Sequence, residues 1–127
     1  MRTSGFVALI FTIVLVVSAA SAHPPKDVKI EFDQGSKMLM VTAYHDTKDA
    51  TKHFVGVIEV DLNGEKVIEQ KFKSQIGTDA QKAHYWVNDA KIGDEISVTA
   101  TCNIAGKKKM SLKIEKKAEG EQPATHH

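Results

Sequence analysis

Six histidines and a single cysteine are the side chains of this 127-residue chain best suited to binding a metal. Three of the histidines, His23, His45 and His53, lie next to segments that alternate like β-strands, and Cys102 ends another such segment. Neutral imidazole and thiolate are ligands for zinc, copper and iron, whereas calcium and magnesium prefer oxygen. The residue types therefore predict a transition-metal site, if the fold brings the four side chains together.

The spacing of these residues leaves a second interpretation open. The chain contains no C-x-x-C or H-x-x-x-H motif. His45 and His53 could be ordinary loop residues, and Cys102 a small buried hydrophobic side chain. Because Cys102 is the only cysteine, it cannot form a disulfide within the chain. Metal ligation, burial or pairing with another chain would each account for it.

Apolar and polar residues alternate with the two-residue period of β-strands through most of the chain. The expected strands cover residues 28–33, 38–44, 54–62, 67–72, 83–87, 96–102 and 110–114. Asn63-Gly64 predicts a two-residue hairpin, because both central positions of a type I′ turn need positive φ. Seven short strands separated by turns, without helical periodicity, predict an all-β antiparallel sandwich. Strand ends can gather at one end of such a sandwich, where the four candidate ligands are expected to meet.

Large apolar side chains, as distinct from the four candidate ligands, are expected to form the core. Trp86 is expected to pack inside the sandwich together with the rest of its strand. The methionines expected in or near the core, rather than in a copper-binding set, are Met38, Met40 and Met110.

Two segments resemble a known family. In the first, a strand ends at His45, and after a polar loop Lys52 and His53 lead into a strand and a hairpin. The second reads Cys102-Asn103-Ile104-Ala105-Gly106. In order and spacing, over about residues 28–114, the chain resembles the iron domain of the superoxide reductases (desulfoferrodoxin and neelaredoxin). That family carries His-Pro, Lys-His and Cys-Asn-x-His-Gly at these places.

The resemblance implies an immunoglobulin-like β-sandwich and a non-haem ferrous centre with four histidine nitrogens, one axial cysteine sulfur and an open sixth position. His23, His45, His53 and Cys102 match ligand positions of the family. Lys52 matches a lysine close to the open position, where it would attract superoxide and could orient a proton-donating water. The implied reaction is the one-electron reduction of superoxide to hydrogen peroxide, with the electron supplied by an unidentified donor.

Ala105 is the main departure from the family, since it replaces the fourth ligand histidine and a methyl group cannot bind iron. The substitute donors could be His84, a water, the amine of a terminal His23, or His126 and His127. Three histidines and one cysteine also suit copper or zinc, so a metal-binding protein without superoxide reductase activity is an alternative. A metal-free sandwich used for binding or scaffolding is a third possibility.

Residues 1–22 have the parts of a cleavable signal peptide in order: Arg2, an apolar stretch over residues 6–17, and the small residues Ala20-Ser21-Ala22. An uncleaved membrane anchor is the alternative, because a spanning helix needs ~20 residues. Cleavage would export the protein to the periplasm or the extracellular space, without a stable membrane span. The predicted organisation is then a signal peptide (1–22), one domain (23–116) and a disordered tail (117–127).

The charge balance of the chain gives no indication of a polyanionic partner. The chain has 17 basic and 16 acidic residues, and removal of Arg2 would leave 16 of each. No nucleic-acid-binding motif is recognisable either.

Cleavage after Ala22 would also make His23 the terminal residue, whose α-amine could bind metal beside its imidazole.

Overall fold

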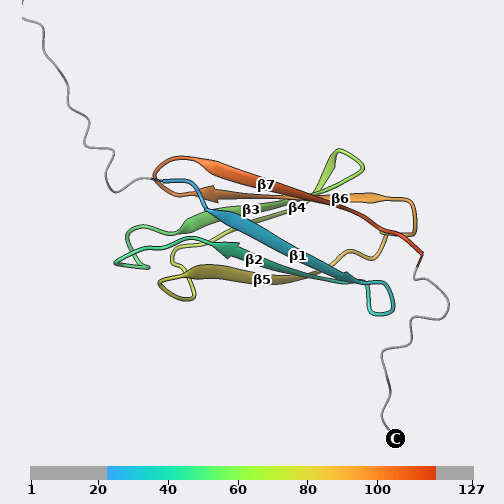
Figure 1. Cartoon of the computed structure of the whole chain (residues 1–127), viewed down its shortest axis with the longest axis horizontal. Coiled ribbons are helices and arrows are strands. Elements are labelled where there is room, and N and C mark those ends of the chain that lie inside the picture. The colour runs from blue at the N-terminus through green and yellow to red at the C-terminus, as the bar shows by residue number, and fades with distance from the viewer. Residues whose placement is uncertain (1–22, 117–127) are drawn as a thin grey trace, which may run out of the picture.

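The computed structural model of the chain describes residues 23–116, which form two packed β-sheets (Figure 1). The strands are β1 (Asp27–Asp33), β2 (Met38–Tyr44), β3 (Val55–Leu62), β4 (Glu65–Lys71), β5 (Ala80–Trp86), β6 (Glu95–Cys102) and β7 (Lys107–Lys113). Within residues 23–116 we find no helix that is long and apolar enough to cross a membrane. The expected signal peptide (1–22) and tail (117–127) lie outside the described residues.

The two sheets contain three and four antiparallel strands, in the orders β1-β2-β5 and β4-β3-β6-β7. The chain passes from one sheet to the other between β2 and β3, between β4 and β5, and between β5 and β6. Crossing of this kind is a property that immunoglobulin-like sandwiches share. The predicted all-β antiparallel sandwich of seven strands is confirmed.

Two of the edge strands begin three residues earlier than the alternation indicated. β5 begins at Ala80 rather than at residue 83, and β7 begins at Lys107 rather than at residue 110. Alternation marks only the part of a strand that faces the core, whereas backbone pairing extends each strand further. Lysine at the start of β7 also suits an edge, because its charge opposes pairing with another chain.

The turn between β3 and β4 has the backbone that its sequence requires. Asn63 and Gly64 have φ angles of 52° and 84°. The Asn-Gly hairpin prediction is therefore confirmed.

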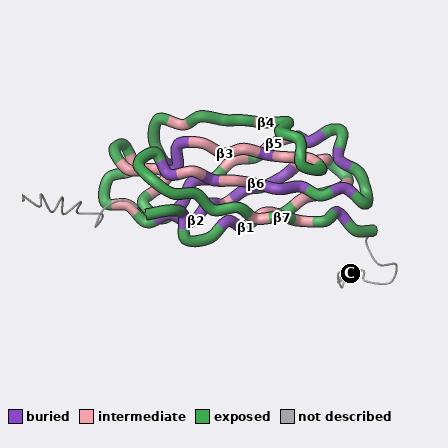
Figure 2. Tube along the Cα trace, turned by 90° about the horizontal axis from the view of Figure 1, so that it is seen from above, coloured by how far each residue is buried: buried purple, intermediate pink, exposed green. Residues whose placement is uncertain are grey.

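The core lies between the two sheets and is built from the inward-facing residue of each alternating pair (Figure 2). Leu39 and Val41 of β2 are buried, and so are Ile58 and Val60 of β3. The same alternation continues in β6, where Val98 is buried. Each sheet thus supplies one wall of the core, and its outer face stays accessible to solvent.

The expectation that Trp86 packs in the core is wrong. Its side chain is 68% exposed at the end of β5, whereas the neighbouring Tyr85 packs against the core. Side-chain direction in a strand alternates at every residue, so the register of β5 decides which aromatic ring faces inward. Met40, on β2, is likewise exposed rather than buried.

One end of the sandwich gathers the strand ends that carry the candidate ligands. The pairing of Asp27 with Tyr44 puts the start of β1 beside the end of β2. The pairing of Val55 with Cys102 puts the start of β3 beside the end of β6. The segments before β1, after β2 and before β3 therefore meet at this end.

Candidate metal site

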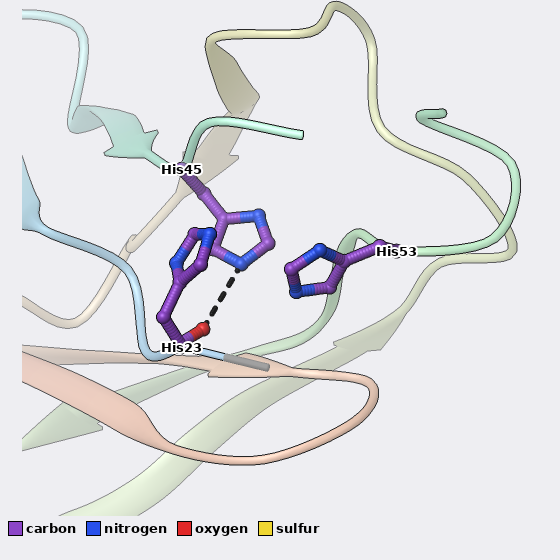
Figure 3. A group of neighbouring side chains, drawn as sticks. All are labelled: His23, His45 and His53. Atoms are coloured by element: carbon purple, nitrogen blue, oxygen red, sulfur yellow. Dashed lines mark hydrogen bonds between the residues drawn. The ribbon is translucent and has the colours of Figure 1, made fainter. Parts of the chain in front are cut away.

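Three histidines converge at this end of the molecule (Figure 3). His23 precedes β1, His45 follows β2, and His53 precedes β3. One ring nitrogen of each lies within 4.8 Å of those of the other two. The ring centroids are 4.6 to 5.0 Å apart, and the rings are tilted or edge-to-face rather than stacked. Imidazoles in this arrangement can direct their nitrogens at a shared cation.

His45 is fixed by a buried glutamine. The Nδ1 of His45 lies 3.0 Å from the Gln75 side-chain oxygen, which also accepts a hydrogen bond from the backbone N–H of Val55 at 3.1 Å. The Gln75 side-chain NH₂ donates to the carbonyl oxygens of His45 and Gly77, both at 2.8 Å. These partners fix the amide orientation, so its oxygen faces His45 and can only accept. His45 therefore carries a proton on Nδ1, and the lone pair of its neutral ring is on Nε2.

The Nε2 atom of His45 faces an oxygen atom. It lies 3.2 Å from the carbonyl oxygen of His23, the contact marked by the dashed line in Figure 3. A neutral ring protonated on Nδ1 would place two acceptors against each other here. A cation bound among the three rings would interact favourably with both of these acceptors.

His53 is positioned by Asn103, from the turn after β6. The side-chain oxygen of Asn103 accepts from the N–H of Phe54 at 2.8 Å, and its NH₂ donates to the carbonyl oxygen of Lys52 at 3.0 Å. The backbone N–H of Asn103 also donates to the Phe54 carbonyl oxygen at 2.9 Å. The chain on both sides of His53 is thus tied to the end of β6.

The Nε2 atom of His53 is buried and has no hydrogen-bond partner within residues 23–116. A buried polar atom without a partner is costly, and native proteins contain few of them. Burial lowers the pKa of His53, and the neighbouring His45 and His23 lower it further. The ring is therefore held in the neutral form, which is the form that binds a metal.

His23 is held by close packing of the segment that carries it. Gly106 has a φ of 89°, and a Cβ atom at this position would lie 2.7 Å from the Cβ of Pro24. Glycine is needed at residue 106 both for its backbone angle and for this approach. The Nδ1 of His23 donates to the carbonyl oxygen of Pro24 at 3.1 Å, which leaves the lone pair of the neutral ring on Nε2.

Of the four predicted ligands, the structure brings His23, His45 and His53 together but does not place Cys102 in their group. Cys102 is buried at the end of β6, where it pairs with Val55, two residues beyond His53. Its sulfur accepts a hydrogen bond from the backbone N–H of Ile104 at 3.5 Å. The sulfur also lies 3.9 Å from the side-chain oxygen of Asn103, to which the thiol donates.

Lys52, the predicted catalytic residue, and Ala105, which is not a predicted ligand, are both exposed. Lys52 immediately precedes His53, and its side chain is exposed to solvent. Ala105, which stands at the place of the fourth histidine of the resembled family, is also exposed. His84, one of the suggested substitutes, lies on β5 outside the histidine group, and His126 and His127 lie outside the described residues.

A hollow open to solvent borders His23, and its rim is mostly basic. The lining residues are His23, Pro24, Pro25, Lys26, Asp46, Lys107 and Lys108. Lys26 and Asp46 form an exposed ion pair at 2.9 Å, and this contact lowers the pKa of Asp46. Lys107 and Lys108 therefore supply the positive charge that remains beside the histidines.

The donor set fits a transition metal. Three imidazoles, two of them with Nε2 free of a proton in the neutral ring, are the ligands that zinc, copper, iron and nickel take. Gln75 is not among the site residues expected from the sequence, and it lies between the expected strands 67–72 and 83–87. A single glutamine in such a stretch carries no signal of its role.

No family model matches the chain, and no curated protein matches it significantly.

Proposed function

We propose that this protein binds a transition-metal ion through His23, His45 and His53. The observation that carries this proposal is the convergence of the three imidazoles, with their ligand atoms within 4.8 Å of one another. The Nε2 of His53 supports it as well, because this atom is buried without a hydrogen-bond partner among the described residues and a metal ion would satisfy it. The orientation of His45 by Gln75 supports it too, since ligand histidines usually donate their other ring N–H to a fixed acceptor.

We further propose that the metal is iron, that Cys102 is its thiolate ligand, and that the protein is exported and reduces superoxide. This rests on the resemblance of the segments around His45, His53 and Cys102 to the superoxide reductases. Ferrous iron would supply the electron, so that superoxide takes up one electron and two protons and becomes hydrogen peroxide. A separate donor would then return the iron to the ferrous state.

The residues around the histidines suit a small anionic substrate. Lys52 is exposed beside His53, and Lys107 and Lys108 border the hollow next to His23. Positive charge near a metal site raises the local concentration of an anion and its rate of association. In this proposal Lys52 attracts superoxide and orients the water that donates a proton, while the histidines and Cys102 hold the metal.

Anaerobic loading with Fe²⁺ tests the proposal in two stages. One ion should bind per chain, and oxidation should produce a thiolate-to-ferric charge-transfer band. Cys102→Ser should lose the band, and His84→Gln, a change outside the histidine group, should keep it. In pulse radiolysis the loaded protein should consume superoxide much faster than free iron does. A rate equal to that of free iron excludes the activity, and a band unaffected by Cys102→Ser excludes the thiolate ligand.

A second candidate function is copper or zinc binding without superoxide chemistry. Ala105 favours it, because the fourth histidine is absent, and Cys102 lies outside the close histidine group. Elemental analysis of protein purified from its native compartment separates the two. Stoichiometric iron supports the first function, and stoichiometric copper or zinc supports the second.

A further inference from the structure

A second set of metal-binding side chains lies on the outer face of the β1-β2-β5 sheet, away from the three histidines. It consists of Met38 and Met40 of β2 with His84 and Trp86 of β5. In the antiparallel register Met40 is directly opposite His84, and Met38 is directly opposite Trp86. Met38 and Met40 are expected from the sequence in or near the core rather than in a copper-binding set, and only the strand pairing brings them beside His84 and Trp86.

All four side chains face outward. Leu39 and Tyr85, the intervening residues, pack in or against the core, so their neighbours in each strand point to the opposite face. Met40 is 36% exposed, Trp86 is 68% exposed, and His84 is exposed as well. The large ring of Trp86 is therefore accessible to a ligand.

The spacing lets these side chains share one ligand. Directly opposite residues of an antiparallel pair have Cβ atoms about 4.5–5.5 Å apart, and diagonal neighbours are about 7–8 Å apart. Met38 is such a diagonal neighbour of His84. The methionine side chain is flexible and has three rotatable bonds, so both thioether sulfurs can turn toward the imidazole.

We propose that Met38, Met40 and His84 bind a single Cu⁺ ion, with the ring of Trp86 against it. Thioether sulfur is a soft ligand that selects Cu⁺, whereas it is poor for Zn²⁺ and for Mg²⁺. A cation over the face of an indole is attracted by the negative potential of the ring. Met40 is also directly opposite Glu31 of β1, the strand that pairs with the other edge of β2. Glu31 adds an acidic neighbour, although it forms an ion pair with Lys29 at 3.2 Å.

This site is distinct from the histidine group. Met40 lies four residues before Tyr44, the last residue of β2, which is about 13 Å along a strand that rises ~3.3 Å per residue. His45 lies beyond that end. The proposal therefore does not depend on which metal the three histidines bind.

The fluorescence of Trp86 gives a local readout, because it is the only tryptophan of the chain. Anaerobic titration of the full chain with Cu⁺, or with Ag⁺ as a redox-inert probe, should quench this fluorescence with a one-to-one endpoint. Met40→Leu, Met38→Leu and His84→Gln should each weaken the apparent affinity at least about tenfold. Leucine nearly conserves the volume of methionine, so the folded structure should be retained.

Two control variants make the result specific. Met110→Leu removes a thioether from β7 of the other sheet, and His45→Ala disrupts the histidine group. Both should keep the wild-type quenching curve. Quenching that survives Met40→Leu and His84→Gln unchanged, or that is lost equally in Met110→Leu, overturns the proposal.

Discussion

At the scale of single residues, each candidate ligand depends on a partner that does not itself bind metal. Gln75 fixes the ring of His45, Asn103 ties the backbone around His53, and Gly106 allows the close approach of the segment that carries His23. These partners come from segments distant in sequence from the ligands. The arrangement of the three nitrogens should therefore be sensitive to changes at these partners as well as at the histidines.

Replacing Gln75 by leucine should lower metal affinity about 10–100-fold, because His45 loses the acceptor that fixes its tautomer and orientation. Gln81→Leu is the matched control. Gln81 is also buried and bonds the backbone of Ser74, Val55 and Ile76, and none of these hydrogen bonds involves a histidine.

Both variants leave buried backbone groups unpaired and should lose stability, by about 1–3 kcal/mol for each such group. Only Gln75→Leu should change the affinity, measured by competition with a chromogenic chelator. Equal affinities for the two variants would show that Gln75 has a structural role alone.

Gly106→Ala should displace Pro24 and weaken metal binding, since the added Cβ meets the atoms of Pro24 at 2.7 to 2.9 Å. Gly93→Ala is the control for backbone strain. Gly93 has a similar φ of 95°, but an added Cβ there meets no atom within 4 Å. Both variants should unfold at lower urea concentration than the wild type. If Gly93→Ala reduced metal affinity as much as Gly106→Ala, the contact with Pro24 would not be the cause.

At the scale of elements, the end of the sandwich away from the histidines is held together by Asp94. Its carboxylate accepts hydrogen bonds from the Asn63 side chain and the Lys91 N–H, both at 3.0 Å. Its backbone N–H and carbonyl oxygen bond to Lys91 and Ile114. This one residue therefore joins the β3–β4 turn, the β5–β6 connection and the chain just after β7.

The pKa of Asp94 is lowered by its bonds to Asn63 and Lys91. The unfolded chain then binds more protons than the folded one at acid pH, so the stabilisation is complete at neutral pH. It is lost as the pH falls through the ordinary aspartate value of about 3.9 toward the lower folded pKa.

Asp94→Asn should therefore be less stable than wild type at neutral pH, with a difference that shrinks on acidification. Urea unfolding between about pH 6 and pH 3 measures it. Asp89→Asn, at an exposed position of the same connection, should leave the pH profile unchanged. A constant gap between Asp94→Asn and wild type would contradict the prediction.

Elements that depend on local signals could be predicted from the sequence, whereas contacts across the fold could not. Asn63-Gly64 specifies its turn through backbone angles alone, and alternation located the strands. The expected position of Trp86 in the core is wrong because a shift of one residue in the register exchanges the inward and outward faces of a strand. The size of a side chain does not determine which of the two faces it occupies. The position of Gln75 against His45 follows only from how the sheets pack.

At the scale of the whole molecule, the histidine group combines residues that lie next to strands of both sheets. His23 and His45 flank strands of the β1-β2-β5 sheet, and His53 precedes β3 of the other sheet. An ion bound by all three would bridge the layers at one end, while Asp94 joins loops at the other. A ligand that binds only the folded chain stabilises it according to its concentration relative to Kd.

A divalent transition metal at 100 times Kd should therefore add about 2.7 kcal/mol to the free energy of unfolding. For a domain of this size that corresponds to an increase of about 10–20 °C in Tm. His53→Gln should abolish the increase, because only two imidazoles remain. His84→Gln, with its change on the outer face of β5, should keep it.

The dependence on concentration separates specific binding from general effects of the metal. With a bound ion, each tenfold rise in free metal above Kd should add about 1.4 kcal/mol, and EDTA should reverse the shift. Weak binding at scattered surface histidines and carboxylates would give a similar response in His53→Gln and in His84→Gln. Retention of the full Tm shift in His53→Gln would therefore exclude the three histidines as one site, because the metal would then stabilise the folded chain without His53.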